Sequence, residues 1–97
     1  VITERYIGYA KKNNLEKIEF YLIKPFNKEI ATCGNGTMIA FLTDSRLNVD
    51  NFHKIAIENG AIDEGLPGLR PSDGSVYYAY IRDVQGNKIC AYSISGT

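Results

Sequence analysis

Residues 37–61, TMIAFLTDSRLNVDNFHKIAIENGA, change their hydrophobic period partway along. In 37–43 the apolar side chains alternate between two faces, which is typical of a β-strand. Farther along, the apolar positions recur at helical spacing, at Val49, Phe52 and Ala56. The stretch therefore predicts a strand followed directly by an amphipathic helix.

The ends of this helix carry the residue types that favour them. Ser45 is a typical N-cap, and Asp44 adds negative charge suited to a helix N-terminus. Gly60 is typical of the position just after a helix ends. The sequence therefore predicts a helix at about 46–59.

Residues 77–93, YYAYIRDVQGNKICAYS, read as a β-hairpin, because two alternating apolar runs flank the polar segment RDVQGN. Pairing Arg82 with Lys88 leaves a five-residue loop between them. The same register predicts the cross-strand pairs Tyr80–Cys90, Tyr78–Tyr92, Ile81–Ile89 and Ala79–Ala91.

The other segments are shorter. Strands are expected at 5–10 and 17–23, and a loop at 26–36. Residues 61–75 are rich in glycine and proline and are expected to form an irregular loop, in which 61–66 leaves room for a short further strand.

Alternation assigns the strand residues to two sides of one sheet. One side suits packing against the helix and gathers Ile39, Phe41, Ile81, Ile89 and Ala91. The other side gathers Met38, Leu42, Tyr78, Tyr80, Cys90 and Tyr92, with Lys88 at the rim and Glu19 and Tyr21 as further candidates. This second side is aromatic and only weakly polar, which favours a concave pocket for a small organic molecule.

Length and charge narrow the classes of function. The 97 residues are expected to form a single domain, 1–97. Eleven basic and eleven acidic residues cancel, so the charge balance indicates neither nucleic acid nor an anionic membrane as a partner. The apolar runs are too short to span a bilayer. The widely separated Cys33 and Cys90 are expected to be free thiols in a reducing cytoplasm.

The segments TMIAF, SRLNVDNFH, GLPGLRP and RDVQGNKI, in this order, resemble the glyoxalase / bleomycin-resistance / extradiol-dioxygenase (vicinal oxygen chelate) superfamily. The resemblance implies an α+β fold of βαβββ modules that form a curved mixed sheet around a cleft. It makes 37–94 a complete second module and 1–25 the closing strands of a truncated first module, N-terminally incomplete.

The resemblance also implies positions for metal ligands, which are His and Glu in the metal-using members. Glu19 falls where the first module often has its acid, Met38 where many members have His, and Cys90 where many have Glu. A thioether and a thiol do not make a hard divalent site. The expectation is therefore a degenerate site at these three positions, with no metal, no other cofactor and no catalytic residue.

Four residues have further chemistry to consider. Arg70 lies on a loop that borders the cleft in the family, and it is expected to hold an anionic group of the ligand. His53 is expected to be a boundary residue of the helix rather than a base, because no acidic partner stands at a set spacing. Cys33 and Cys90 lack the base and orienting group that a nucleophile needs.

These observations favour a protein that binds a small organic ligand through Met38, Tyr78, Tyr80, Cys90, Tyr92, Arg70 and Glu19. The alternative is a divalent-metal-dependent lyase or isomerase, such as a lactoylglutathione lyase, or a dioxygenase. A third reading is an interaction module whose sheet pairs with another chain. In each case a homodimer is expected, because the apolar side of 17–23 needs a cover.

Overall fold

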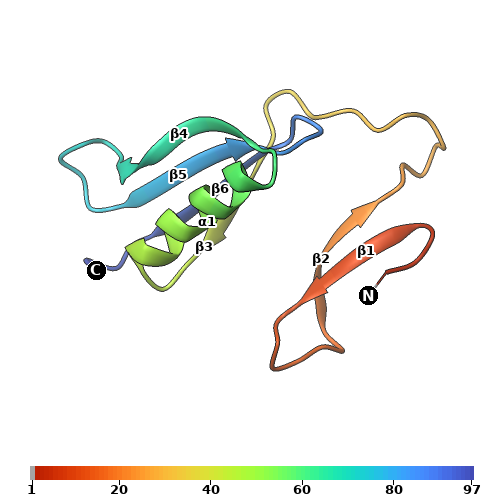
Figure 1. Ribbon diagram of the computed structural model, residues 1–97, viewed down its shortest axis with the longest axis horizontal. Helices are drawn as coiled ribbons and strands as arrows, with labels where there is room; N and C mark the ends of the chain where they lie inside the picture. Colours follow the sequence, from red (N-terminus) through yellow and green to blue (C-terminus); the bar gives the residue numbers. More distant parts are fainter. Residues whose placement is uncertain (1) are drawn as a thin grey trace. The chain divides into compact units, whose positions relative to one another are not determined.

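The computed structural model describes residues 2–97, and the chain divides into two compact units. The N-terminal unit ends at Ala31 and the C-terminal unit begins at Thr32. Figure 1 labels the strands and the helix of both units. Each unit is described below by itself.

The N-terminal unit is an antiparallel hairpin of β1 (Tyr6–Ala10) and β2 (Ile18–Ile23), which confirms the strands expected at 5–10 and 17–23. A Cβ at Gly8 would lie 2.9 Å from the Cγ2 atom of Ile18. The side chain of Ile18 therefore lies directly against the β1 backbone, and only glycine leaves room for it there.

The C-terminal unit follows the order β3 (Met38–Leu42), α1 (Arg46–Glu58), β4 (Ile62–Leu69), β5 (Tyr77–Arg82) and β6 (Lys88–Ser93). The sheet order is β3-β6-β5-β4, with β3 parallel to β6 and the other neighbours antiparallel (Figure 1). This is a βαβββ unit with a mixed sheet, so the α+β fold class expected from the sequence is confirmed.

Strand β4 corrects the expectation of an irregular loop at 61–75 and confirms the short further strand for which 61–66 left room. Eight of these residues form a strand that pairs with β5, with register shifts between Asp63 and Gly65 and between Gly65 and Gly68. Glycine and proline made the segment look like a loop, whereas irregular pairing admits both residue types. The loop is confined to the residues between Leu69 and Tyr77.

The β5–β6 hairpin has the predicted register, with Arg82 opposite Lys88 and Tyr80 opposite Cys90. The Asp83 carboxylate organises its turn by accepting hydrogen bonds from the backbone N–H groups of Gln85 and Asn87, both at 2.9 Å. Burial acts to raise the pKa of Asp83, but hydrogen bonds from Asn87 and its neighbours outweigh it and leave that pKa below its usual value.

Helix α1 has the predicted caps. The Ser45 hydroxyl oxygen accepts a hydrogen bond from the backbone N–H of Asn48 at 3.2 Å. Gly60, just after the helix, has a φ of 98°, which suits glycine. The helix buries Val49 against Ala79 and Ala91, and Phe52 and Tyr77 pack around this core.

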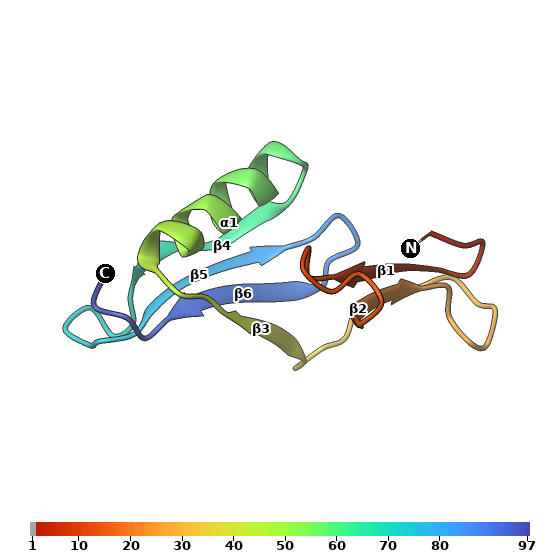
Figure 2. The same cartoon turned by 90° about the horizontal axis from the view of Figure 1, so that it is seen from below.

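The helix covers less of the sheet than the sequence indicated. Within residues 2–97, α1 lies close to β4, β5 and β6 but not to the edge strand β3. Figure 2 shows α1 above β4 and β5, with β3 on the far side of β6. Ile39 and Phe41 each remain 40% exposed, so the expectation that they pack against the helix was wrong.

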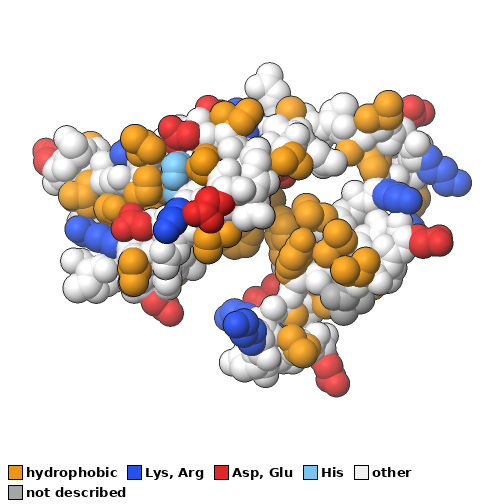
Figure 3. All heavy atoms as spheres, in the orientation of Figure 1, with side chains coloured by type: hydrophobic (Ala, Val, Ile, Leu, Met, Phe, Trp, Pro, Cys, Tyr) orange, Lys and Arg blue, Asp and Glu red, His pale blue; other side chains and the backbone are white. Residues whose placement is uncertain are grey.

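Apolar side chains appear in orange on the visible surface of both units in Figure 3. Among residues 2–97, no helix combines the length and the apolarity needed to cross a bilayer.

Candidate functional site

Three tyrosines form a continuous stack on the sheet side opposite the helix. The rings of Tyr78 and Tyr80 are 5.6 Å apart at 11°, and those of Tyr78 and Tyr92 are 5.5 Å apart at 23°. Alternation along β5 and the β5–β6 pairing bring them together, since Tyr78 lies opposite Tyr92 and two residues from Tyr80. We call Tyr78, Tyr80 and Tyr92 the tyrosine row. All three are half-buried, so the row presents aromatic surface to the solvent.

Cys90 lies on the same side of the sheet, beneath the rings. It is opposite Tyr80 in the ladder and is fully buried. Burial raises the pKa of the Cys90 thiol, and the charge of Lys88 offsets only part of this effect. Desolvation also raises the pKa of Tyr80. Both shifts favour the protonated, neutral form, and a protonated thiol is a poor nucleophile.

Two cations flank the Tyr80 ring. The guanidinium carbon of Arg70 lies 5.9 Å from the ring centroid, and the Nζ atom of Lys88 lies 5.4 Å from it. These distances are within the range of cation–π attraction. The aromatic surface is therefore bordered by positive charge at the Tyr80 end.

Six of the seven predicted ligand-binding residues belong to the C-terminal unit: Met38, Arg70, Tyr78, Tyr80, Cys90 and Tyr92. Met38 pairs with Lys88 across the β3–β6 ladder and is 43% exposed. The seventh, Glu19, lies on β2 of the N-terminal unit, where it is exposed and 4.0 Å from Lys11. The sheet thus brings together the row, its cations and Met38.

The residues at the family's metal-ligand positions do not fit a divalent cation. Met38 offers a thioether, and Cys90 offers a thiol that burial keeps protonated. Mg²⁺, Mn²⁺ and Fe²⁺ prefer oxygen or imidazole ligands, and zinc takes sulfur only as thiolate.

His53 is placed differently from the sequence expectation. It is only 8% exposed, and its Nε2 atom lies 2.9 Å from the Oδ1 atom of Asp63 on β4. The hydrogen bond from His53, together with one from the Gly65 N–H, lowers the pKa of Asp63. The sequence missed this partner because Asp63 lies ten residues along the chain, at no spacing typical of a helix, and only the placing of β4 beside α1 brings the two together. The pair ties α1 to β4 on the helix side of the sheet, away from the tyrosine row.

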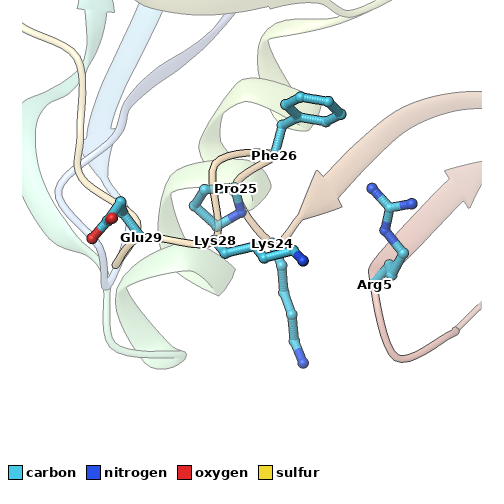
Figure 4. Close-up of a pocket in the computed structure, with 6 residues that line it drawn as sticks. All are labelled: Arg5, Lys24, Pro25, Phe26, Lys28 and Glu29. Atoms are coloured by element: carbon cyan, nitrogen blue, oxygen red, sulfur yellow. The ribbon is translucent and has the colours of Figure 1, made fainter.

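A hollow of about 620 Å³ lies in the N-terminal unit and was not anticipated from the sequence. Figure 4 shows its lining, which consists of Arg5, Lys24, Pro25, Phe26, Lys28 and Glu29. Three cations against one carboxylate favour an anionic guest. Phe26 is 89% exposed, however, so the hollow is open to solvent. Lys28, one of the lining residues, has a φ of 64°, which is unusual for a residue other than glycine. No sequence pattern indicated this backbone conformation.

Comparison with known proteins defines the class of this chain. It belongs to the glyoxalase/bleomycin resistance protein family, in agreement with its βαβββ unit and with the resemblance of its sequence. The relationship rests on the crystal structure of a glyoxalase/bleomycin resistance protein from Albidiferax ferrireducens T118. That protein is 35% identical, with a TM-score of 0.80 over 96% of this chain and 72% of its own.

The fold is also shared with hypothetical protein SA1046 from S. aureus, which is 19% identical. Its TM-score is 0.56 over 69% of this chain and 50% of its own. No family model and no curated protein matches the chain.

Proposed function

We propose that this protein binds a small organic ligand on the tyrosine row, without the divalent metal that other members of the superfamily use. The stacking of Tyr78 with both Tyr80 and Tyr92 carries the proposal, because three nearly parallel, stacked rings build a continuous aromatic platform on one side of the sheet. Such a platform suits a planar guest, which it holds by stacking and by burial of apolar area. Met38, exposed on the adjacent edge strand, adds an adaptable apolar contact.

The alternative is a metal-dependent lyase, isomerase or dioxygenase of the same superfamily. It needs an acid and an imidazole where the chain has Cys90 and Met38. The buried, protonated Cys90 argues against it. Glu19, on the other unit, is the carboxylate that remains at these positions.

Titration of the purified protein with a neutral planar aromatic, 2-naphthamide, tests the proposal through tyrosine fluorescence and calorimetry. Saturable binding is expected, and Tyr78→Leu should weaken it by roughly fivefold, since each stacked ring contributes about 1 kcal/mol. The control is Tyr9→Leu, which removes a half-exposed tyrosine of the N-terminal unit. Equal affinities for both variants, or no saturable binding, would contradict the proposal.

Elemental analysis of the purified protein distinguishes the metal-dependent enzyme from the metal-free binding protein. We expect no stoichiometric Zn, Ni, Mn or Fe in the purified protein and no glyoxalase activity when these ions are added. The double substitution Met38→His with Cys90→Glu should introduce weak divalent binding if Glu19 completes the set. Close to one equivalent of metal in the wild type would favour the enzyme.

We also infer a homodimer. Strand β3 is an edge of its sheet, and its apolar residues Met38, Ile39 and Leu42 are 43%, 40% and 60% exposed. An apolar edge of this kind is a liability unless another chain or segment covers it. Sedimentation at micromolar concentration should show a dimer, and Leu42→Lys should weaken it. A monomer at every concentration would refute the inference.

We make two further proposals, one on the domain organisation of the chain and one on its location in the cell. The β1–β2 hairpin is the counterpart of the closing strands of a βαβββ module, so the chain would act as one domain with parts of two modules. The protein would work in the reducing cytoplasm, because Cys33 is an exposed free thiol. Mass spectrometry of Cys33 in freshly lysed cells should find it reduced.

A further inference from the structure

The charge around the tyrosine row is asymmetric. Both cation–π contacts of the row fall on Tyr80, one from Arg70 and one from Lys88. On the same side of the sheet, Arg82 is already neutralised, because its Nε–H donates to Glu64. Two positive charges therefore remain at the Tyr80 end of the row.

The position of Arg70 is built into strand β4. A Cβ at Gly65 would lie 3.2 Å from the Nη2 atom of Arg70, and a Cβ at Gly68 would lie 3.0 Å from the Nη1 atom. The guanidinium thus occupies space that two absent side chains leave free. Its Nη2–H donates to the carbonyl oxygen of Leu66 at 2.7 Å, which fixes its orientation. These contacts hold Arg70 beside the Tyr80 ring.

The guanidinium keeps donors for a guest. Within residues 2–97 it donates only the hydrogen bond to Leu66, whereas a guanidinium has five N–H groups. The charge of Arg70 acts on Asp63, but the lowered pKa of Asp63 is due first to the hydrogen bond from His53 and only last to Arg70. Arg70 is therefore oriented but not neutralised.

We propose that the site selects planar aromatic anions of the carboxylate class, with the ring against the tyrosine row and the carboxylate at Arg70, within the field of the Lys88 charge. This inference rests on the proposed function and adds the polarity of the ligand. A guanidinium held in one orientation can bind both oxygens of a carboxylate, and the Lys88 ammonium adds a point charge. A cationic planar guest would meet the same charges and be repelled.

The test compares three probes with one ring system: 2-naphthoate, neutral 2-naphthamide and cationic 2-naphthylmethylammonium. At low salt, 2-naphthoate should bind roughly tenfold more tightly than the amide, and the ammonium compound least tightly. Arg70→Gln and Lys88→Gln should each reduce the preference by about threefold, as expected for partly exposed charge pairs. Lys54→Gln is the control, because it removes an exposed charge from the helix side.

A salt titration of the wild type keeps the inference testable even if Arg70→Gln fails to fold. Raising the salt from about 0.02 M to about 0.5 M shortens the Debye length from roughly 20 Å to about 4 Å and should erase most of the preference. If 2-naphthamide binds as tightly as 2-naphthoate at low salt, this inference fails and the proposed function stands. If none of the three probes binds, both fail.

Discussion

Removing the Tyr80 ring should both expose the buried Cys90 thiol and destabilise the sheet. Tyr80 lies opposite Cys90 and stacks on Tyr78. Its ring also makes cation–π contacts with Arg70 and Lys88. The substitution Tyr80→Ala removes all of these contacts at once. Tyr80→Phe keeps the ring and is the matched control.

The expected loss follows from the contacts. Truncating a fully buried aromatic side chain costs about 3–5 kcal/mol, and a half-buried ring such as Tyr80 should cost about half as much, roughly 2 kcal/mol. The stacked pair with Tyr78 adds about 0.5–1.5 kcal/mol, and each exposed cation contact adds about 0.5 kcal/mol. The free energy of unfolding should therefore fall by about 4 kcal/mol in Tyr80→Ala, and by less than about 1 kcal/mol in Tyr80→Phe.

Urea unfolding measures the stability, and a coloured aromatic disulfide reagent measures access to the thiol. The protein with Tyr80 and the Tyr80→Ala variant both carry Cys33→Ser, so that Cys90 is the cysteine observed. With Tyr80 present, Cys90 should react roughly a hundredfold more slowly than a free thiol, since it must wait for a local opening. In Tyr80→Ala the reaction should be fast. Rapid reaction in the presence of Tyr80, or continued protection in Tyr80→Ala, would refute the arrangement of ring over thiol.

Three other substitutions test the helix side and strand β4. Val49→Ala should lower the free energy of unfolding by about 2 kcal/mol, because Val49 is fully buried in the core, as urea unfolding will show. Asp63→Asn should destabilise the protein at neutral pH, and the difference from the wild type should shrink as the pH falls below 3.8. The reason is that the folded-state pKa of Asp63 is lowered, so its contribution is present above its ordinary value of 3.8 and is lost as the pH falls through the lowered one. A difference that persists unchanged in acid would contradict this account. Gly65→Ala should cost about 1–3 kcal/mol and displace Arg70, because the new Cβ would lie 2.7 Å from the Cδ2 atom of Tyr80. If stability and the preference for 2-naphthoate were both unchanged, strand β4 would accommodate the new Cβ without cost and the reasoning would be wrong.

Local pattern determined most of the C-terminal unit. The change of period after Asp44, the cap at Ser45 and the register of the hairpin from Arg82 to Lys88 are properties of short segments, and all three are confirmed. The tyrosine row follows from that register, because the period of two assigns each strand residue to a side of the sheet. The family also follows from the order of these segments.

Tertiary structure decided what depends on long-range pairing. Strand β4 looks like a loop until β5 supplies hydrogen bonds to its Gly- and Pro-containing backbone, and the partnership of His53 with Asp63 follows only from that pairing. The helix lies over β4, β5 and β6, which leaves Ile39 exposed on β3 even though its alternation marks the helix side. Alternation assigns a residue to a side of the sheet, but the path of the helix across that side decides which of its residues are covered.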